Sequence, residues 1–367
     1  MEPEDRIKRR AAMEQLVSEA DAYAPAGPAE PQGRGEKPVK KKRGALRKLV
    51  SALGWVLIAL LLLLLAGFVY QWFGEREDRP AFVAPGQLVE VEGRRMHVYV
   101  EEKPGKAADE ATVVLIAGWG TASPYADFSP MYEFLQEQAQ FAVVERFGYG
   151  YSDITDEKRD IDRITEEMHE ALQQAGVEPP YVLTGHSLGS LEAIRFAQLY
   201  PDEVQGIVTI DAGSPEFYKT FPVRTMQLQR VAIKSGLVRA LYHVNGFDAY
   251  LNGQRNGLKR LSPEMKEQDR LATLLVAIND NVTDEIRRTH ANADKLIAAK
   301  SRLDIPMIQL VADQFGAVTE EWMDTQRQFG ESWSDDSKTV VVQGSGHAIH
   351  AYDPKSTAEA ALELLNR

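Results

Sequence analysis

The chain has 367 residues, of which 44% are hydrophobic and 26% are charged, as in folded proteins rather than disordered or collagen-like ones. Its net charge is -12, from 42 basic and 54 acidic residues, so we expect no nucleic-acid partner. The absence of cysteine excludes disulfides, thiolate metal sites and a cysteine nucleophile.

Residues 1–48 form a basic amino-terminal segment with 12 basic and 8 acidic residues. Its charged part, residues 6–22, could form a short helix, and a linker rich in Pro, Gly, Ala and Glu follows at 24–38. This composition is typical of a segment that is disordered in isolation.

The next 26 residues, 49–74, contain no charged side chain. A helix crosses a bilayer with about 20 apolar residues, so this stretch is long enough. A buried helix of a soluble protein would need a polar face, and a cleavable signal peptide would need a shorter leader and a shorter apolar stretch. We therefore predict an uncleaved signal anchor with the lipid bilayer as its partner.

The flanks of this segment predict its orientation. Seven basic residues lie between Lys37 and Lys48, whereas residues 75–79 carry both signs of charge. Positive residues stay on the cytoplasmic side, so we expect a cytoplasmic amino terminus and an extracytoplasmic domain from residue 75 onward in a cell membrane. A nucleic-acid patch is the alternative interpretation of the basic cluster, but its position beside the span favours lipid headgroups.

From residue 87 the pattern becomes short runs rich in Val, Ile and Leu that alternate with helical segments, which is typical of a mostly parallel sheet covered by helices. We predict a hairpin at 87–92 and 96–101 and helices at 161–175 and 188–199. The remaining predicted strands are 112–117, 141–145, 181–184, 207–210, 307–311 and 339–342.

Residues 213–303 break this alternation because they carry amphipathic helical patterns and few strand-like runs. We predict a helical cap inserted between two parts of one α/β core, 75–212 and 304–367. Long insertions of this kind often bind substrates, although a surface bundle without function is the simpler alternative.

The sequence Gly-His-Ser-Leu-Gly at residues 185–189 lies between a predicted strand and a predicted helix. A serine at such a sharp turn has its hydroxyl lifted out of the sheet, and the flanking glycines avoid collisions with neighbouring backbone. Because a hydroxyl is a weak nucleophile, Ser187 needs a base such as an imidazole. His347 is our candidate, His350 is the alternative, and His186 is expected to pack against the helix start.

Residues 87–367 resemble the α/β-hydrolase fold, with an eight-stranded, mostly parallel sheet, helices on both faces and a helical cap. The resemblance is carried by the serine motif and by three further motifs in the same order. These are Ala-Gly-Trp-Gly at 117–120, similar to an oxyanion loop with Ala117 in place of His; Arg-Phe-Gly-Tyr-Gly-Tyr-Ser-Asp at 146–153; and Gly-Ser-Gly-His at 344–347.

The resemblance implies that the backbone N–H groups of Trp119 and Leu188 would bind the oxyanion. It also implies an acid that orients the histidine, and two residues are candidates. Asp211 follows the predicted sixth strand, where some relatives have their acid, and Asp313 comes two residues before the family's more common position. We favour Asp211 because its position needs no shift.

The resemblance therefore implies a serine esterase or lipase that acts through an acyl-serine on a small acyl substrate. Together with the predicted anchor at 49–74, this gives a membrane-anchored enzyme, whose proximity to the bilayer is the reason to consider lipid-like substrates. It implies no metal or organic cofactor. Serine at the turn argues against the dehalogenase and epoxide hydrolase branches, which use Asp as nucleophile. The alternatives are a catalytically inactive binding or signalling member of the family and an anchored interaction protein that works through its basic tail.

Overall fold

The computed structural model describes residues 41–107, 109–221, 223, 227–299, 302–314 and 319–367. The predictions for residues 1–40 lie outside the described residues. The described residues begin with helix α2 (Lys41–Asp78), which is followed by the short helix η1 (Arg79–Ala81). It divides into two compact units, Met1–Ala59 and Leu60–Arg367, so the boundary falls within α2.

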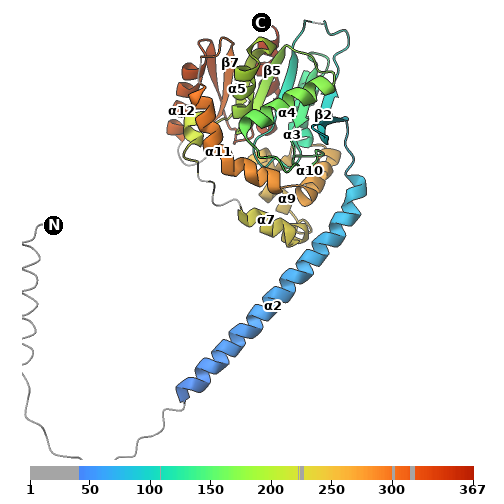
Figure 1. Cartoon of the computed structure of the whole chain (residues 1–367), viewed down its shortest axis with the longest axis vertical. Coiled ribbons are helices and arrows are strands. Elements are labelled where there is room, and N and C mark those ends of the chain that lie inside the picture. The colour runs from blue at the N-terminus through green and yellow to red at the C-terminus, as the bar shows by residue number, and fades with distance from the viewer. Residues whose placement is uncertain (1–40, 108, 222, 224–226, 300–301, 315–318) are drawn as a thin grey trace, which may run out of the picture. The chain divides into compact units, whose positions relative to one another are not determined.

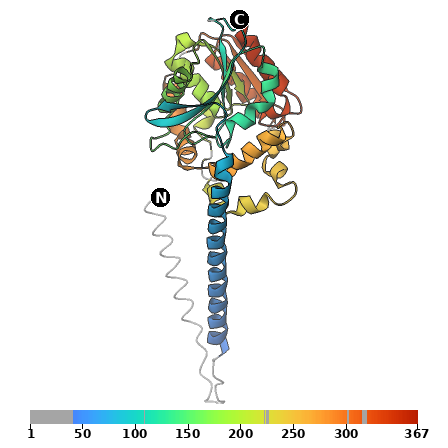
Figure 2. The same ribbon diagram turned by 90° about the vertical axis from the view of Figure 1, so that its right-hand side faces the viewer.

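The second unit is built on one eight-stranded sheet in the order β1-β2-β4-β3-β5-β6-β7-β8 (Figures 1 and 2). Strands β3 to β8 run parallel, and β1 and β2 form an antiparallel hairpin at one edge, with β2 antiparallel to β4. The predicted α/β-hydrolase architecture is confirmed. The strands are β1 (Gln87–Val91), β2 (Arg94–Glu101), β3 (Thr112–Ile116), β4 (Phe141–Glu145), β5 (Tyr181–His186), β6 (Val204–Ile210), β7 (Met307–Ala312) and β8 (Ser337–Val342).

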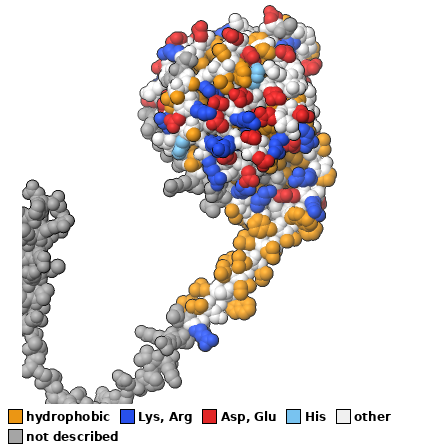
Figure 3. Space-filling view, viewed as in Figure 1, with side chains coloured by type: hydrophobic (Ala, Val, Ile, Leu, Met, Phe, Trp, Pro, Cys, Tyr) orange, Lys and Arg blue, Asp and Glu red, His pale blue; other side chains and the backbone are white. Residues whose placement is uncertain are grey.

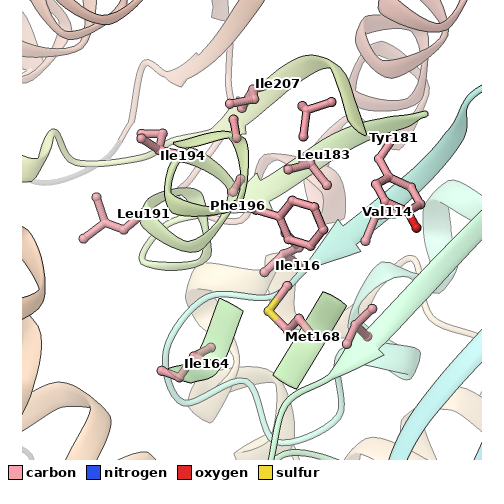
Figure 4. Packing of buried hydrophobic residues seen from close by; sticks show 14 of the residues in the cluster. Val114, Ile116, Ile164, Met168, Tyr181, Leu183, Leu191, Ile194, Phe196 and Ile207 are labelled. Atoms are coloured by element: carbon pink, nitrogen blue, oxygen red, sulfur yellow. The ribbon is translucent and has the colours of Figure 1, made fainter. Parts of the chain in front are cut away.

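Helices cover both faces of this sheet, and alternate strand residues face opposite layers. Val114 and Ile116 of β3 join the core beneath α4 and α5, whereas Val113 and Leu115 join the core beneath α3 and α14. Figure 4 shows the first of these layers, where Met168 and Phe196 pack on the strands. The helices of the core are α3 (Pro124–Leu135), α4 (Ile161–Gln174), α5 (Gly189–Leu199), η2 (Pro201–Glu203), α12 (Thr319–Trp333), α13 (Ile349–Tyr352) and α14 (Pro354–Leu365).

Local sequence signals explain where several helices begin. Helices α3, α6 (Pro215–Tyr218), α10 (Pro263–Leu275) and α14 each start with proline, whose missing N–H is not needed in the first turn. In each case the preceding residue accepts a hydrogen bond from a backbone N–H of the first turn. These capping residues are Ser123, Ser214, Ser262 and Asp353.

The segment predicted as a cap, between β6 and β7, is helical in its described residues. It contains α6 (Pro215–Tyr218), α7 (Gln227–Lys234), α8 (Leu237–Leu241), α9 (Phe247–Leu251), η3 (Gly253–Leu258), α10 (Pro263–Leu275) and α11 (Asp280–Ala298). Its own apolar core includes Ile233, Leu274 and Val282, with Tyr149 contributed by the loop after β4. The cap therefore packs over the end of the sheet where parallel strands release their carboxyl-terminal loops.

Candidate active site

Ser187 occupies a sharp turn between β5 and α5, with a positive φ of 49° that a non-glycine residue rarely adopts. The turn is tight on both sides. A Cβ on Gly185 would lie 2.7 Å from the Cα of Ser190, and a Cβ on Gly189 would lie 2.5 Å from the carbonyl oxygen of Ala117. The Ser187 N–H donates to the carbonyl of Ile210 at 2.9 Å, which fixes the turn against the end of β6.

The side chains of Ser187, His347 and Asp211 form a continuous hydrogen-bonded row. Oγ of Ser187 lies 3.0 Å from Nε2 of His347, and Nδ1 of His347 lies 2.7 Å from Oδ2 of Asp211. The three residues follow β5, β8 and β6, whose parallel register brings their carboxyl ends together. With the carboxylate on Nδ1, the Nε2 atom faces the Ser187 hydroxyl and can accept its proton.

Asp211 is completely buried and has a positive φ of 44°, so its carboxylate is held at a second constrained turn. The N–H of Ala312, at the end of β7, donates to its Oδ1 atom at 3.0 Å. One carboxylate oxygen therefore bonds the neighbouring strand while the other faces His347. Because each oxygen of Asp211 has its own partner, the carboxylate holds the His347 ring in one orientation.

The two residues offered as alternatives by the sequence lie elsewhere. Asp313 accepts a hydrogen bond from the N–H of Ser345 at 3.1 Å, so it supports the loop that carries His347 rather than contacting the imidazole. His350 is fully buried and bonds Oδ2 of Asp127 through Nε2 at 2.9 Å. The geometry pairs Ser187 with His347 and His347 with Asp211.

His186, beside the nucleophile, is buried between two other imidazoles. Its ring centre lies 4.9 Å from that of His347 and 4.8 Å from that of His350. Burial, together with these two histidines, holds the pKa of His186 well below its ordinary value. His186 therefore stays neutral and packs at the turn, which agrees with the packing role expected from the sequence.

The loop after β3 passes directly beside the nucleophile. A Cβ on Gly118 would lie 2.9 Å from Nδ1 of His186 and 3.0 Å from the Cβ of Ser187, so a larger residue here would force these two side chains to shift. The next residue, Trp119, donates through its indole N–H to the carbonyl of Val282 in the cap at 2.7 Å. Within the described chain, neither the Trp119 N–H nor the Leu188 N–H donates to a backbone carbonyl. Leu188 follows Ser187 directly and Trp119 follows Gly118, which lies beside Ser187, so these two N–H groups stay the predicted oxyanion donors.

Arg146 supports the beginning of this loop, at Ala117. Its guanidinium donates to the carbonyl of Ala117 at 2.7 Å and pairs with Glu192 at 2.8 Å and Glu285 at 3.3 Å. All three charged groups are buried. Burial, and the second carboxylate, raise the pKa of Glu192 to about 8, against the opposing effect of Arg146. This cluster of two acids around one guanidinium links the loop to α5 and α11.

Tyr218, in the first cap helix α6, was missed by the sequence analysis. Its phenol oxygen lies 3.4 Å from Oγ of Ser187, and its side chain is buried. Burial raises the pKa of Tyr218 to about 12, so the phenol keeps its proton at neutral pH and can donate a hydrogen bond. No local motif marks this residue, because its role depends on how the chain turns after β6.

One cluster has the composition of a metal site. Ligand atoms of Asp127, His186 and His350 lie within 4.8 Å of one another, and all three residues are buried. However, the guanidinium of Arg255 already bonds Asp127 at 2.6 Å. A fixed cation at this distance repels a divalent metal, so the residues fit a buried ion-pair network better than a metal centre.

Comparison with known proteins identifies relatives with the same fold. A profile of the alpha/beta hydrolase fold family matches residues 111–283, which include the serine turn. The chain is 27% identical over 314 residues to the uncharacterized protein YbdG of Bacillus subtilis strain 168, covering 85% of this chain and 95% of YbdG. It is 25% identical over 256 residues to the putative carbamate hydrolase RutD of Escherichia coli O150:H5, covering 69% of this chain and 90% of RutD.

Solved structures show the same fold. Epoxide hydrolase A from Mycobacterium thermoresistibile superimposes with a TM-score of 0.53 at 17% identity, covering 77% of this chain and 98% of the enzyme. At this identity the likeness concerns the arrangement of strands and helices, and the chemistry depends on the side chains described above.

Proposed function

The chain belongs to the α/β-hydrolase superfamily, and from that premise we propose that it is a membrane-anchored serine hydrolase that cleaves an ester or related acyl bond. The observation that carries the proposal is the row from Ser187 through His347 to Asp211, with separations of 3.0 and 2.7 Å. A nucleophile, a base and an orienting acid in hydrogen-bond contact are the minimal apparatus of acyl transfer.

The proposed reaction has two steps. Nε2 of His347 takes the proton of Ser187 as Oγ attacks the carbonyl carbon, and the backbone N–H groups of Trp119 and Leu188 bind the oxyanion. His347 then gives that proton to the leaving alkoxide, which leaves an acyl-serine. Water loses a proton to His347, attacks the acyl carbon and releases the acid, and the proton returns to Ser187.

The nucleophile decides between the reactions of the relatives. A serine forms an ester with an acyl group, whereas an epoxide has no carbonyl for it to acylate, so we do not transfer the activity of the epoxide hydrolases. A carbamate does carry a carbonyl, and the similarity to RutD makes carbamate cleavage the second candidate. Both reactions use the same oxyanion site, and they differ in the group next to the carbonyl.

Helix α2 supports the proposed anchoring in a cell membrane. The part of the chain from Arg47 to Ala81 contains the only helix, among the described residues, that is long and apolar enough to cross a bilayer, with a mean hydropathy of 2.8 in a window that is wholly exposed. The 26 residues 49–74 would span about 39 Å at a rise of about 1.5 Å each. We propose a single span with residues 1–48 in the cytoplasm and the hydrolase domain outside.

The test is labelling of the purified full chain with a fluorophosphonate, followed by mass spectrometry to locate the adduct. We expect labelling at Ser187, none in Ser187→Ala, and strong loss in His347→Ala. Ser129→Ala serves as a matched control, because Ser129 only bonds its own helix. If the folded chain takes no label at Ser187, the alternative of an inactive binding protein is favoured. If Ser187 is labelled, the rates of hydrolysis of an ester and a carbamate of the same alcohol distinguish the two candidate reactions.

A further inference from the structure

The cap carries most of the exposed apolar side chains outside helix α2. Beyond Phe73 the described residues expose eight large hydrophobic side chains, and five of them lie between residues 231 and 251. These five form what we name the cap apolar surface: Val231, Leu237, Val244, Tyr250 and Leu251. Tyr250 is 84% exposed, which is unusual for a side chain of its size.

This surface begins where the cap touches α2. A Cβ on Gly67 would lie 2.2 Å from the carbonyl oxygen of Ser235, and a Cβ on Gly236 would lie 2.6 Å from the carbonyl oxygen of Gly67. The turn between α7 and α8 therefore packs backbone to backbone on the helix. Val231 and Leu237 lie on either side of this turn, and Figure 3 shows hydrophobic side chains continuing from α2 onto the adjoining part of the cap.

Polar contacts hold the two elements together a little further along α2. Gln71 donates to the carbonyl of Leu274 at 2.8 Å and accepts from Nε of Arg239 at 2.9 Å. Arg239 also pairs with Asp78 at 2.5 Å, and both Gln71 and Arg239 are buried. Because buried polar groups are costly to separate once paired, the cap keeps a fixed position on this part of the helix.

The position of Gly67 in the apolar stretch 49–74 indicates how deep in the bilayer the contact between α2 and the α7–α8 turn would lie. Gly67 is the 19th residue from Leu49, and a helix needs about 20 residues to cross the hydrocarbon core. Glu75, the first charged residue after the stretch, lies about 12 Å further along at a rise of about 1.5 Å per residue. A span placed with Lys48 at the inner boundary thus brings the α7–α8 turn to the outer boundary of the hydrocarbon.

We propose that the cap apolar surface lies in the outer interface of the same bilayer that α2 crosses, so that its occupant is lipid. The inference rests on the membrane anchoring proposed above. Its exposed aliphatic side chains would contact acyl chains, and Tyr250 would lie at the headgroup level, where aromatic rings with a polar end are favoured. The same cap contributes Tyr218 to the site of Ser187, so the proposal gives the hydrolase direct access to acyl groups in the membrane.

The test measures immersion of single labelled positions in the full chain. Because the chain has no cysteine, single cysteines can carry an environment-sensitive nitrobenzoxadiazole probe without background. We would label Leu237→Cys and Val244→Cys in the cap, Leu62→Cys in α2, and Asp335→Cys, which precedes β8 at the opposite end of the parallel strands. The chain is reconstituted one per nanodisc of phosphatidylcholine and phosphatidylglycerol with doxyl-labelled lipid, which removes contacts with a second copy.

We expect doxyl lipid to quench the probes at Leu62, Leu237 and Val244, and aqueous iodide to quench the probe at Asp335. Quenching at Leu62 together with iodide access at Leu237 and Val244 would overturn the cap surface while leaving the anchor intact. Iodide access at Leu62 would overturn the anchor and the surface with it. The same probes are also measured in vesicles that hold several chains. If the probe at Leu237 is protected from iodide in these vesicles but not in single-chain nanodiscs, the surface contacts a second copy and the proposal is overturned.

Discussion

Arg255 of the cap lies 2.6 Å from Asp127 of α3 and connects the cap to the active site through buried side chains. Asp127 bonds His350 at 2.9 Å, and the His350 ring lies 4.8 Å from His186, the residue before the nucleophile. Burial alone would raise the pKa of Asp127, but Arg255 and His350 together hold it below its usual range. The ion pair between Arg255 and Asp127 therefore helps to hold His350 and His186 in place behind the nucleophile.

The first prediction concerns this pair and its dependence on pH. Replacing Arg255 by Gln leaves the Asp127 carboxylate buried without its main counter-charge, and removal of one partner of a buried pair typically costs about 3–5 kcal/mol. Because the folded pKa of Asp127 is depressed, its stabilisation is present above the ordinary pKa of an aspartate, about 3.9, and is lost as pH falls below it. We expect the difference in the free energy of unfolding between wild type and Arg255→Gln, measured with urea, to become smaller as the pH falls below that value.

The control is Arg327→Gln, which removes one partner of an exposed ion pair. A difference between wild type and Arg255→Gln that stays constant across the acid range would contradict the depressed pKa of Asp127.

The second prediction compares the two carboxylates considered for the orienting acid. Asp211→Asn would stabilise the wrong tautomer of His347, and a change of this kind lowers kcat by about 10⁴-fold in a serine enzyme of known mechanism. Asp313→Asn keeps an oxygen that can accept from the Ser345 N–H, so we expect little loss. Turnover of a soluble ester and the rate of fluorophosphonate labelling measure both variants. Equal losses in the two variants would argue against Asp211 as the partner of His347.

The sequence predicted the positions of the strands and of the serine turn well, because buried parallel strands are short apolar runs and because glycines flank the serine. It placed the end of β5 at Thr184, whereas the strand runs on to His186 and turns only at Ser187. It left Asp211 and Asp313 open because both follow strands that end on the same side of the sheet, and only the register of β6 against β7 brings one of them to His347.

Other parts of the site depend on contacts between segments far apart in the chain. Arg146 bonds the Ala117 carbonyl of the loop after β3, and its acid partners lie on α5 and α11. Tyr218 reaches Ser187 from the cap. The spacing of residues in the sequence does not predict contacts of this kind, so the roles of Arg146 and Tyr218 can be recognised only in the folded structure.

The third prediction tests Tyr218. If its phenol donates a hydrogen bond to the reacting group beside Ser187, Tyr218→Phe should lower kcat by up to about tenfold, since a neutral hydrogen bond contributes about 0.5–1.5 kcal/mol. KM for a small soluble ester should change little. Steady-state kinetics of Tyr218→Phe and of the control Tyr200→Phe, whose ring stacks on His169, would show this difference. An unchanged kcat would reduce Tyr218 to a packing residue.

The fourth prediction follows from the raised pKa of Glu192. A carboxyl whose pKa rises from 4.5 unfolded to about 8 folded binds its proton more tightly in the folded state, so stability falls as pH rises between these values. Glu192→Gln removes this titration while keeping a hydrogen-bonding side chain beside Arg146. We expect its unfolding free energy to decline less than that of wild type between pH 5 and about 8, measured by urea unfolding. Parallel profiles for the two proteins would show that Glu192 is already ionised in the folded state.

The last prediction uses two glycines of α2 that differ only in their surroundings. A Cβ on Gly67 would lie 2.2 Å from the Ser235 carbonyl oxygen, whereas a Cβ on Gly54 meets no described atom within 4 Å. Gly67→Leu must therefore push the α7–α8 turn away from the helix, and Gly54→Leu should change nothing of the cap. If the cap lies on lipid, we expect Gly67→Leu to lower turnover of an ester embedded in nanodiscs severalfold relative to turnover of a short soluble ester, with Gly54→Leu retaining the wild-type ratio. The same ratio in all three proteins would mean that the contact between α2 and the cap has no influence on how the enzyme reaches its membrane substrate.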